Sequence, residues 1–299
     1  MPSNFAAWIA SPYASPLVVK SAPEPCLGPK DVVVQTAFVA INPLEYKIQD
    51  YNPAIGGWKL RYPTIIGSDL AGTIVSVGSE VTLCKVGDRV MANAPGMNAF
   101  QNFVALPESS ITLVPENMSL KAAVVLPLAC DTAMAGLFVQ DQLGLSTTCL
   151  GDSESSPRPS NWVLLVWGGS SSVGCCATQM AVAAGYEVYA VASTRNHTLC
   201  SLLGASRVFD YANDKVEDAI VRALEEKTVV GALDCISDSE RTIPACARIL
   251  AQTNGQKKLV TVLAPRDTVF TKDIEVRRRK LLCIEWPRFS TCQAKENAQ

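Results

Sequence analysis

The sequence predicts an α/β protein of two domains, a strand-rich β-barrel followed by a doubly wound parallel sheet. The chain has 299 residues, of which 48% are hydrophobic and 18% charged, and this composition supports two cores. Short β-branched runs between glycine and proline turns fill the part up to about residue 125. From Trp162 onward, continuously apolar strands alternate with helical segments, which is typical of a parallel sheet covered on both faces.

The N-terminal part has its strand pattern in residues 31–41, 71–78, 88–94 and 103–115, the last as two short strands. Residues 119–145 contain good helix formers, and Pro127 divides them into two helical pieces. Residues 146–161 are polar and are expected to form a surface loop.

The C-terminal part alternates between the two patterns. We expect strands at 162–167, 186–193, 207–211, 232–236 and 258–264, and helices to about 184, at 197–204, 214–228 and 242–252. Within 214–228, Val216, Ile220 and Leu224 share one helix face. Residues 272–286 are expected to supply a last strand.

Charge and hydropathy exclude several classes of protein. The net charge of −2 gives no overall basic field for nucleic acid or anionic lipid, and the basic run 277–280 is expected to be a solvated face. The N-terminus has no signal-peptide pattern, and Pro127 and Asp131 interrupt the longest apolar run, 122–139. We expect a cytoplasmic protein without a membrane span.

Cysteine and histidine usage argues against a metal centre. None of the 11 cysteines has C-x-x-C spacing, and we expect them to be mostly buried thiols. His197 is the single histidine, so a site with several histidine ligands is excluded. It stands at an expected helix start, and we interpret it as a surface or capping-region residue.

The turn after the strand 162–167 has the composition of a phosphate-binding loop. Its six-residue frame runs from Gly169 to Gly174 and keeps the first and third glycines of a dinucleotide turn, with Ser171 at the middle position. A helix N-terminus directly after such a turn offers unpaired N–H groups to an anion. We therefore expect the turn from Gly169 to Gly174 to hold a dinucleotide phosphate.

The end of the second strand indicates which dinucleotide binds. NAD-selective sites place an acidic residue there, whereas this chain has Ser193 to Asn196 with Arg195 among them. Arg195 offers a charge-assisted hydrogen bond to a 2′-phosphate, and Tyr211 follows the third strand near the adenosine side. NADPH is the predicted cofactor; the alternative is that Arg195 is only a solvated helix-start residue.

A further pattern lies in the barrel part, G-x-D-x-A-G-x-V-x-x-V-G followed by G-D-R-V. With the block 38–50 before it and βαβ units after it, the chain resembles the medium-chain dehydrogenase/reductase superfamily to about residue 290. The pattern occupies Gly67, Asp69, Ala71, Gly72, Ile74-Val75, Val77, Gly78 and Gly87-Asp88-Arg89-Val90.

The resemblance is to the zinc-free branch, which contains quinone and enoyl reductases. Zinc-dependent members carry a cysteine and a histidine where this chain has Asn42 and 67–69, and the cysteine cluster of their structural zinc lobe is absent. The segments GGSSSVG, ASTRN, FDY, ALDCI and PLACDTA are most similar to the ToxD-like group, which includes trans-acting enoyl reductases of fungal polyketide clusters.

This resemblance implies a GroES-like domain (1–125), a Rossmann NADP-binding domain (126–290) and a tail (291–299). It implies NADPH-dependent reduction of an α,β-unsaturated acyl thioester, with hydride going to the β-carbon and a proton to the α-carbon. The implied cofactor residues are Leu44, Glu45, Tyr46, Lys47, Ser170, Ser171, Ser172, Val173, Ser193, Thr194, Arg195, Asn196, Tyr211, Val262 and Leu263. The implied substrate residues are Cys130, Asp131, Thr132, Ala133, Met134, Ala135, Gly136 and Leu137.

Lys47 and Thr132 are the candidates for polarising or positioning the substrate. The alternative for Lys47 is a surface lysine paired with Glu45 or Asp50, and the alternative for Thr132 is a helix-capping hydroxyl.

Family chains return to the barrel after the last Rossmann strand, and this C-terminal return segment is expected to be missing here. Three functions therefore stay open: an active enoyl reductase working with a polyketide synthase on a carrier-bound or free acyl substrate, a catalytically weak NADP-binding protein, and a quinone reductase. The sequence does not decide between a monomer and a homodimer.

Overall fold

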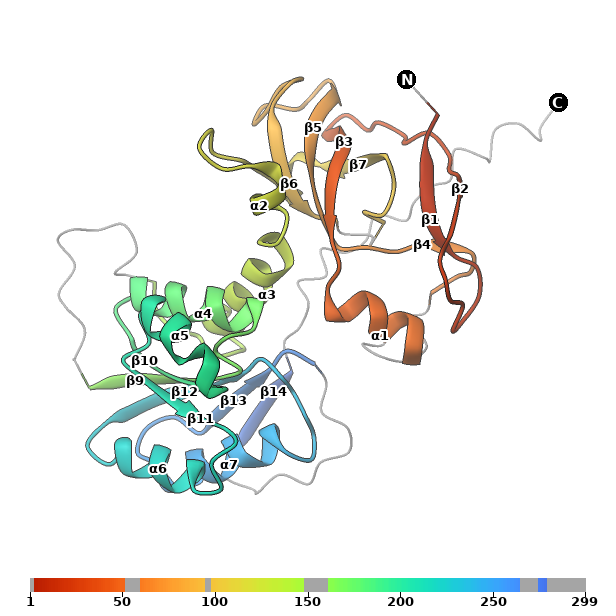
Figure 1. Ribbon diagram of the computed structural model, residues 1–299. Coiled ribbons are helices and arrows are strands. Elements are labelled where there is room, and N and C mark those ends of the chain that lie inside the picture. The colour runs from red at the N-terminus through yellow and green to blue at the C-terminus, as the bar shows by residue number, and fades with distance from the viewer. Residues whose placement is uncertain (1–2, 52–59, 95–97, 148–160, 264–273, 279–299) are drawn as a thin grey trace. The chain divides into compact units, whose positions relative to one another are not determined.

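The structure is a computed structural model that describes residues 3–51, 60–94, 98–147, 161–263 and 274–278. The chain divides into two compact units, the first running to Leu128 and the second beginning at Ala129. Figure 1 draws the first unit in red to yellow and the second in green to blue.

The first unit contains two antiparallel sheets, with strand orders β7-β3-β5-β6-β8 and β2-β1-β4. Its strands are β1 (Phe5–Ile9), β2 (Val18–Ser21), β3 (Asp31–Ala40), β4 (Thr64–Ile65), β5 (Asp69–Val77), β6 (Arg89–Asn93), β7 (Phe103–Pro107) and β8 (Ile111–Leu113). Its helices are α1 (Pro43–Tyr51) and α2 (Leu120–Ala123), with a 3₁₀ turn at Glu108–Ser110.

Alternating side chains build the core of the larger sheet. Val90 and Ala92 of β6 are buried while their neighbours in the strand are partly exposed, as expected for a sheet with one face on the core. They pack with Leu70 and Ile74 of the adjacent strand β5 and with Val34 of β3. Helix α1 begins shortly after this sheet in the chain, since β3 ends three residues before Pro43.

The second unit contains a six-stranded sheet in the order β11-β10-β9-β12-β13-β14, in which all neighbouring pairs are parallel. The strands are β9 (Trp162–Trp167), β10 (Glu187–Ala192), β11 (Arg207–Asp210), β12 (Thr228–Asp234), β13 (Lys258–Thr261) and β14 (Glu275–Arg278). The helices are α3 (Pro127–Phe138), α4 (Ser172–Ala183), α5 (His197–Leu202), α6 (Val216–Ala223) and α7 (Thr242–Gln252).

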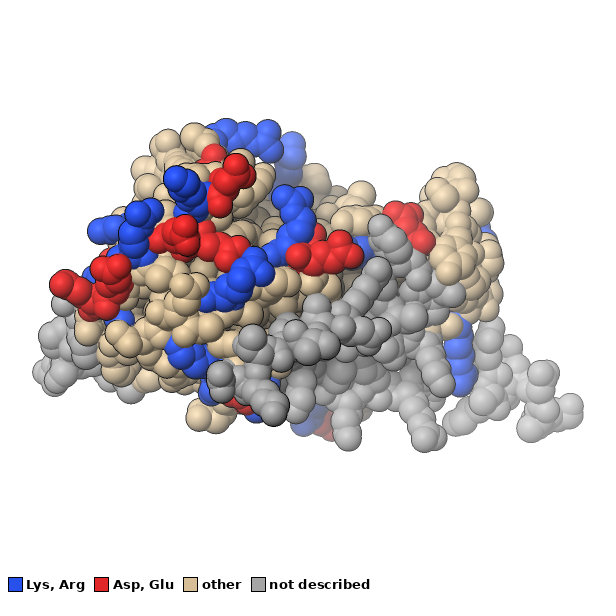
Figure 2. Space-filling model, turned by 90° about the horizontal axis from the view of Figure 1, so that it is seen from below, with Lys and Arg blue, Asp and Glu red and all other residues tan. Residues whose placement is uncertain are grey.

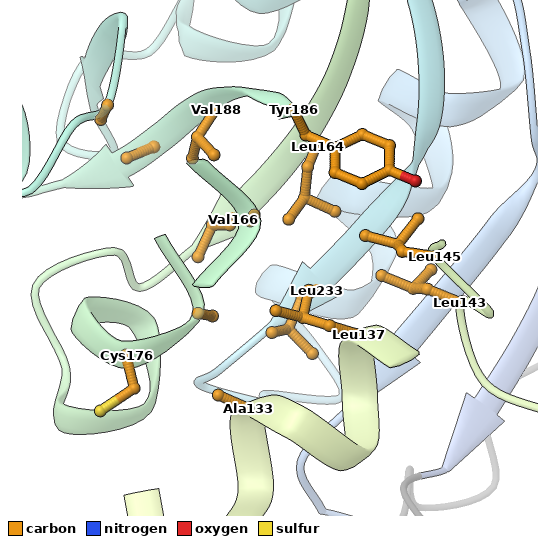
Figure 3. Close-up of a cluster of buried hydrophobic side chains, with 14 of the residues drawn as sticks. Ala133, Leu137, Leu143, Leu145, Leu164, Val166, Cys176, Tyr186, Val188 and Leu233 are labelled. Atoms are coloured by element: carbon orange, nitrogen blue, oxygen red, sulfur yellow. The ribbon is translucent and has the colours of Figure 1, made fainter. Parts of the chain in front are cut away.

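Helices cover both faces of this sheet, so its strands are apolar on both sides. Leu164 and Val166 of β9 face a core with α3 and α4, which Figure 3 shows around Leu137 and Cys176. Val163 and Leu165 of the same strand face the core with α6 and α7. The doubly wound architecture predicted from the sequence is confirmed, and its parallel strands bring their following loops to one edge.

Several predicted elements differ in length from the observed ones, and for two of them the backbone gives the reason. The strand predicted at 232–236 spans Thr228–Asp234, because Gly231, with a φ of +132°, takes up a register shift and does not end the strand. The helix predicted over 214–228 ends at Ala223, since Leu224 already has a non-helical backbone. The loop 146–161 and the strand predicted at 272–286 lie partly outside the described residues.

The segment Leu120–Phe138 is long and apolar enough to cross a membrane by length and composition alone. Pro127 starts a new helix within it, and 44% of its most apolar window is buried inside the protein. Much of its apolar surface therefore packs against protein. On the face drawn in Figure 2, the described basic and acidic side chains are intermixed, so this face carries no broad basic patch.

Candidate functional site

The loop between β9 and α4 presents a helix N-terminus at the carboxyl edge of the sheet. Gly168 turns the chain with a φ of +76°, a conformation that favours glycine. Ser171 caps α4, and its Oγ accepts a hydrogen bond from the Gly174 N–H at 3.0 Å. The N–H groups of Ser172 and Val173 have no intrahelical acceptor, so they are available to an anion.

Glycine is required in this loop for close packing as well. A Cβ on Gly174 would lie 2.2 Å from the Gly168 carbonyl oxygen, and a Cβ on Gly169 would lie 2.8 Å from Ala190 Cβ. The sharp bend, expected at Gly169, is at Gly168, and Gly169 instead allows the turn to approach β10. The loop is thus a cradle whose walls leave no room for side chains at these positions.

The loop after β10 lies next to this cradle. Ser193 precedes a 3₁₀ turn at Thr194–Asn196, and α5 then begins at His197. The Asn196 side-chain amide donates to Ser170 Oγ at 3.0 Å and to Ser193 Oγ at 3.1 Å. The structure therefore brings together the predicted pyrophosphate and 2′-phosphate residues, and Arg195 is exposed beside them.

An acidic residue at the end of β11 also reaches this loop. Thr194 Oγ1 donates a hydrogen bond to Asp210, and the Ala212 N–H donates to the same carboxylate at 2.9 Å. These two bonds lower the pKa of Asp210 below its ordinary value of 3.8. Tyr211 follows it and is 51% exposed. Asp210 was not predicted as a site residue, because the selecting acid of a dinucleotide site is expected at the end of the second strand.

The loops after β12 and β13 meet through a buried aspartate. Asp234 is fully buried and accepts hydrogen bonds from Thr242 Oγ1 at 2.5 Å and from the Ile236 N–H at 2.9 Å. Burial raises the pKa of this carboxyl group above 3.8. Its carbonyl oxygen accepts from the Val262 N–H at 3.3 Å, which positions the predicted ribose-binding segment.

In the first unit, α1 carries the four residues predicted at the nicotinamide end, Leu44, Glu45, Tyr46 and Lys47. Glu45 is buried and its carboxylate accepts from the Asn42 N–H at 2.6 Å and from the Ser68 N–H and hydroxyl at 2.8 and 2.7 Å. The bond to Asn42 is the reciprocal half of a capping box. Asn42, Pro43 and Glu45 are sequence signals for a helix start, although this helix was not predicted.

Within the part of the chain that the structure describes, Lys47 forms neither of the ion pairs, with Glu45 or with Asp50, that a role as a paired surface lysine requires. Its side chain is half-buried, and it makes no hydrogen bond or ion pair with any other described residue, because Glu45 bonds elsewhere. Burial lowers the pKa of the Lys47 amino group below its ordinary value of 10.5. A half-buried ammonium that no described side chain pairs with can donate to a ligand carbonyl oxygen.

The residues at the zinc-ligand positions do not fit zinc. Asn42 Nδ2 donates to Asp69 Oδ2 at 2.9 Å, and Leu128 N–H donates to Asp69 Oδ1 at 2.8 Å. Ser68 bonds to Glu45, as described above. No group of three histidine, cysteine or acidic side chains suited to a metal occurs in the described part of the chain. Internal hydrogen bonds thus occupy the positions where zinc ligands would stand.

The eight predicted substrate residues, from Cys130 to Leu137, all lie on α3. Thr132 is buried in the middle of this helix, so the capping alternative is wrong. Asp131 and Met134 are exposed, whereas Ala133 and Leu137 belong to the core in Figure 3. Cys130 Sγ lies 3.7 Å from Cys176 Sγ on α4, and this contact together with burial raises the pKa of Cys176.

An apolar groove of about 440 Å³ lies in the first unit between β1 and the end of β3. Phe5, Phe38, Ile41 and Phe100 are among its lining residues. None of the predicted cofactor-binding, substrate-binding or catalytic residues lines this groove.

Two family models match the chain, the alcohol dehydrogenase GroES-like domain over residues 28–116 and the zinc-binding dehydrogenase over residues 172–289. The dehydrogenase pigH of Monascus ruber is 38% identical over 295 residues, which cover 96% of this chain and 78% of pigH. The chain belongs to the medium-chain dehydrogenase/reductase family. The trans-enoyl reductase himH of Aspergillus japonicus is 38% identical over 259 residues, covering 84% of this chain and 72% of himH.

Solved structures of this family share the fold. An alcohol dehydrogenase superfamily protein from Novosphingobium aromaticivorans has a TM-score of 0.76 at 24% identity, covering 94% of this chain and 80% of that protein. The CurK enoyl reductase has a TM-score of 0.71 at 19% identity, covering 93% and 81%. The GroES-like and Rossmann-type fold expected from the sequence is therefore confirmed. By its family the chain is an oxidoreductase.

Proposed function

We propose that this chain is a zinc-independent, NADPH-dependent enoyl reductase that reduces an α,β-unsaturated acyl thioester for a polyketide synthase in the cytoplasm. The observation that carries the proposal is the cradle between β9 and α4, which Asn196 connects to the loop after β10. The name of the relative himH, a trans-enoyl reductase, supports the substrate class.

The cradle fits a dinucleotide phosphate on the structure's own terms. A side chain at Gly174 would clash with the backbone of the turn, the first amides of α4 are unpaired, and Ser170 and Ser193 offer hydroxyl groups. Residues 170–173 would hold the pyrophosphate, and Ser193, Thr194 and Arg195 the 2′-phosphate, with Tyr211 beside them. Val262 and Leu263 would border the nicotinamide ribose. When bound, the cofactor supplies the hydride that the double bond accepts.

The protein's own groups would polarise the thioester. The ammonium group of Lys47 would donate to the carbonyl oxygen, where negative charge develops as the double bond is reduced. Its lowered pKa brings proton donation closer to the working pH. Thr132 would position the acyl group from α3. The internally bonded cluster of Asn42, Ser68 and Asp69 leaves charge stabilisation to such groups instead of a zinc ion.

The test is a titration of the full chain with NADPH, followed by nicotinamide fluorescence, and then addition of crotonyl thioester. Binding followed by loss of reduced nicotinamide would support the reductase. If NADPH binds but is oxidised neither with the thioester nor with a quinone, the result would favour a catalytically weak NADP-binding protein. Oxidation with the quinone alone would favour a quinone reductase, and no binding would overturn the proposal.

A further inference from the structure

The side-chain amide of Asn196 connects two loops that the sequence keeps apart. It donates one hydrogen bond to Ser170 Oγ, in the loop after β9, and one to Ser193 Oγ, in the loop after β10. An amide nitrogen has two hydrogens, and both are used here. Asn196 therefore has no side-chain N–H left for a ligand, although the sequence placed it among the ligand-binding residues.

The hydroxyl groups of Ser170 and Ser193 can each still donate a hydrogen bond. Each Oγ accepts from Asn196, and neither hydroxyl donates to another described residue. A hydroxyl that accepts one hydrogen bond still has its own hydrogen to donate. Ser170 and Ser193 thus each keep one donor, and a phosphate oxygen is the acceptor that such donors bind most strongly.

The backbone fixes the geometry of this connection. The Asn196 N–H donates to the Ser193 carbonyl oxygen at 2.8 Å within the 3₁₀ turn, so the side chain starts from a held position. Ser170 stands two residues before α4 and follows Gly169, whose approach to Ala190 leaves no room for a side chain. The two hydroxyls are consequently held by rigid neighbours on both sides of the amide.

We propose that Asn196 is a positioning residue that orients Ser170 toward the pyrophosphate and Ser193 toward the 2′-phosphate of one NADPH molecule. This inference rests on the proposed function, since it concerns the same cofactor site. We call Ser170, Asn196 and Ser193 the Asn196 bridge. The bridge acts through its serines, so the selectivity for NADPH over NADH depends on an amide that touches neither phosphate.

The experiment measures dissociation constants of the full chain for NADPH and NADH. The variants are Ser170→Ala, Ser193→Ala, Asn196→Ala, and Asn196→Ala combined with each serine substitution. Asn161→Ala is the matched control, because Asn161 is exposed and precedes β9 at the opposite edge of the sheet. Thermal unfolding midpoints are recorded for every variant, and Asn196→Leu repeats the test with the side-chain volume kept if Asn196→Ala lowers the midpoint.

The bridge predicts a distinctive coupling pattern. Ser193→Ala and Asn196→Ala each weaken NADPH binding about tenfold, as loss of a hydrogen bond to a charged group does. Adding Ser193→Ala to Asn196→Ala costs less than a further twofold. With NADH, Ser193→Ala stays within twofold, while Ser170 and Asn196 remain coupled for both cofactors. Asn161→Ala binds both like the parent.

Other outcomes overturn the inference in distinguishable ways. Losses that multiply in the double variants would show that Asn196 does not act through the serines. Equal weakening of NADPH and NADH by Ser193→Ala would break the link to the 2′-phosphate. A parent chain that binds neither cofactor overturns the bridge and the proposed function together, whereas binding with multiplying losses overturns the bridge alone.

Discussion

The Gly174→Ala substitution tests whether the close approach of α4 to its preceding turn builds the site. The added Cβ would lie 2.2 Å from the Gly168 carbonyl oxygen and 2.8 Å from Gly169 Cα. Relieving the first contact to 3.0 Å requires a shift of about 0.8 Å, and such overpacking costs about 1–3 kcal/mol. Alanine returns at most about 1 kcal/mol of helix propensity. We therefore expect a net loss of stability and displacement of the Ser172 and Val173 amides.

Urea unfolding and NADPH titration measure the two effects. The free energy of unfolding should fall by about 1–2 kcal/mol, and the dissociation constant should rise at least about tenfold, because misplacing a binding group by 1 Å is costly. Gly136→Ala is the matched control for stability. It lies inside α3, and its Cβ would meet side-chain atoms alone, Leu233 Cδ1 at 3.0 Å and Val260 Cγ1 at 3.6 Å, so stability should stay level or rise. A Gly174→Ala chain as stable as the parent, with parent affinity, would refute the close-packing argument.

Four further substitutions have defined outcomes. Lys47→Met should lower the turnover of crotonyl thioester at least about tenfold, and it should remove an alkaline decline whose midpoint lies below 10.5 in the parent, since burial lowers the pKa of Lys47. Arg195→Ala should weaken NADPH about tenfold and leave NADH within twofold, as paired titrations would show. Glu45→Ala leaves three donors without their acceptor, two of them on the buried Ser68, so urea unfolding should show a loss of at least about 2 kcal/mol. Asp210→Asn should tighten NADPH, and weaker NADH binding instead would mean that the carboxylate serves the ribose hydroxyls.

The parts of the fold that depend on local pattern were predictable. Apolar strands such as 162–167 and the amphipathic face of Val216 and Ile220 indicate a parallel sheet with helices on both faces. The glycine–serine turn indicates the edge of the sheet where a phosphate is expected to bind. The bend was placed one residue too late, at Gly169, because spacing alone does not say which of two adjacent glycines has a positive φ.

The contacts that organise the site were not predictable, because they join residues distant in sequence. Asn196 bonds to Ser170 across 26 positions, and Glu45 bonds to Ser68 across 23. The capping signal of Asn42, Pro43 and Glu45 was present in the sequence, but the strand-rich surroundings concealed it. Burial of Lys47 also needs the tertiary structure, since its own neighbours in sequence suggested an ion pair.

Asp210 and Arg195 place opposite charges next to the loop after β10, and the two side chains differ in their hydrogen bonding and exposure. Asp210 accepts hydrogen bonds from Thr194 and from the Ala212 N–H. These donors offset part of the negative charge and fix the orientation of the carboxylate. Arg195 is exposed and can turn its planar group toward a doubly charged phosphate. An acidic residue without such internal donors would favour the ribose hydroxyls of NADH. The proposed preference for the 2′-phosphate rests on this difference, because the carboxylate is already engaged while the guanidinium and the Ser193 hydroxyl still have donors to offer.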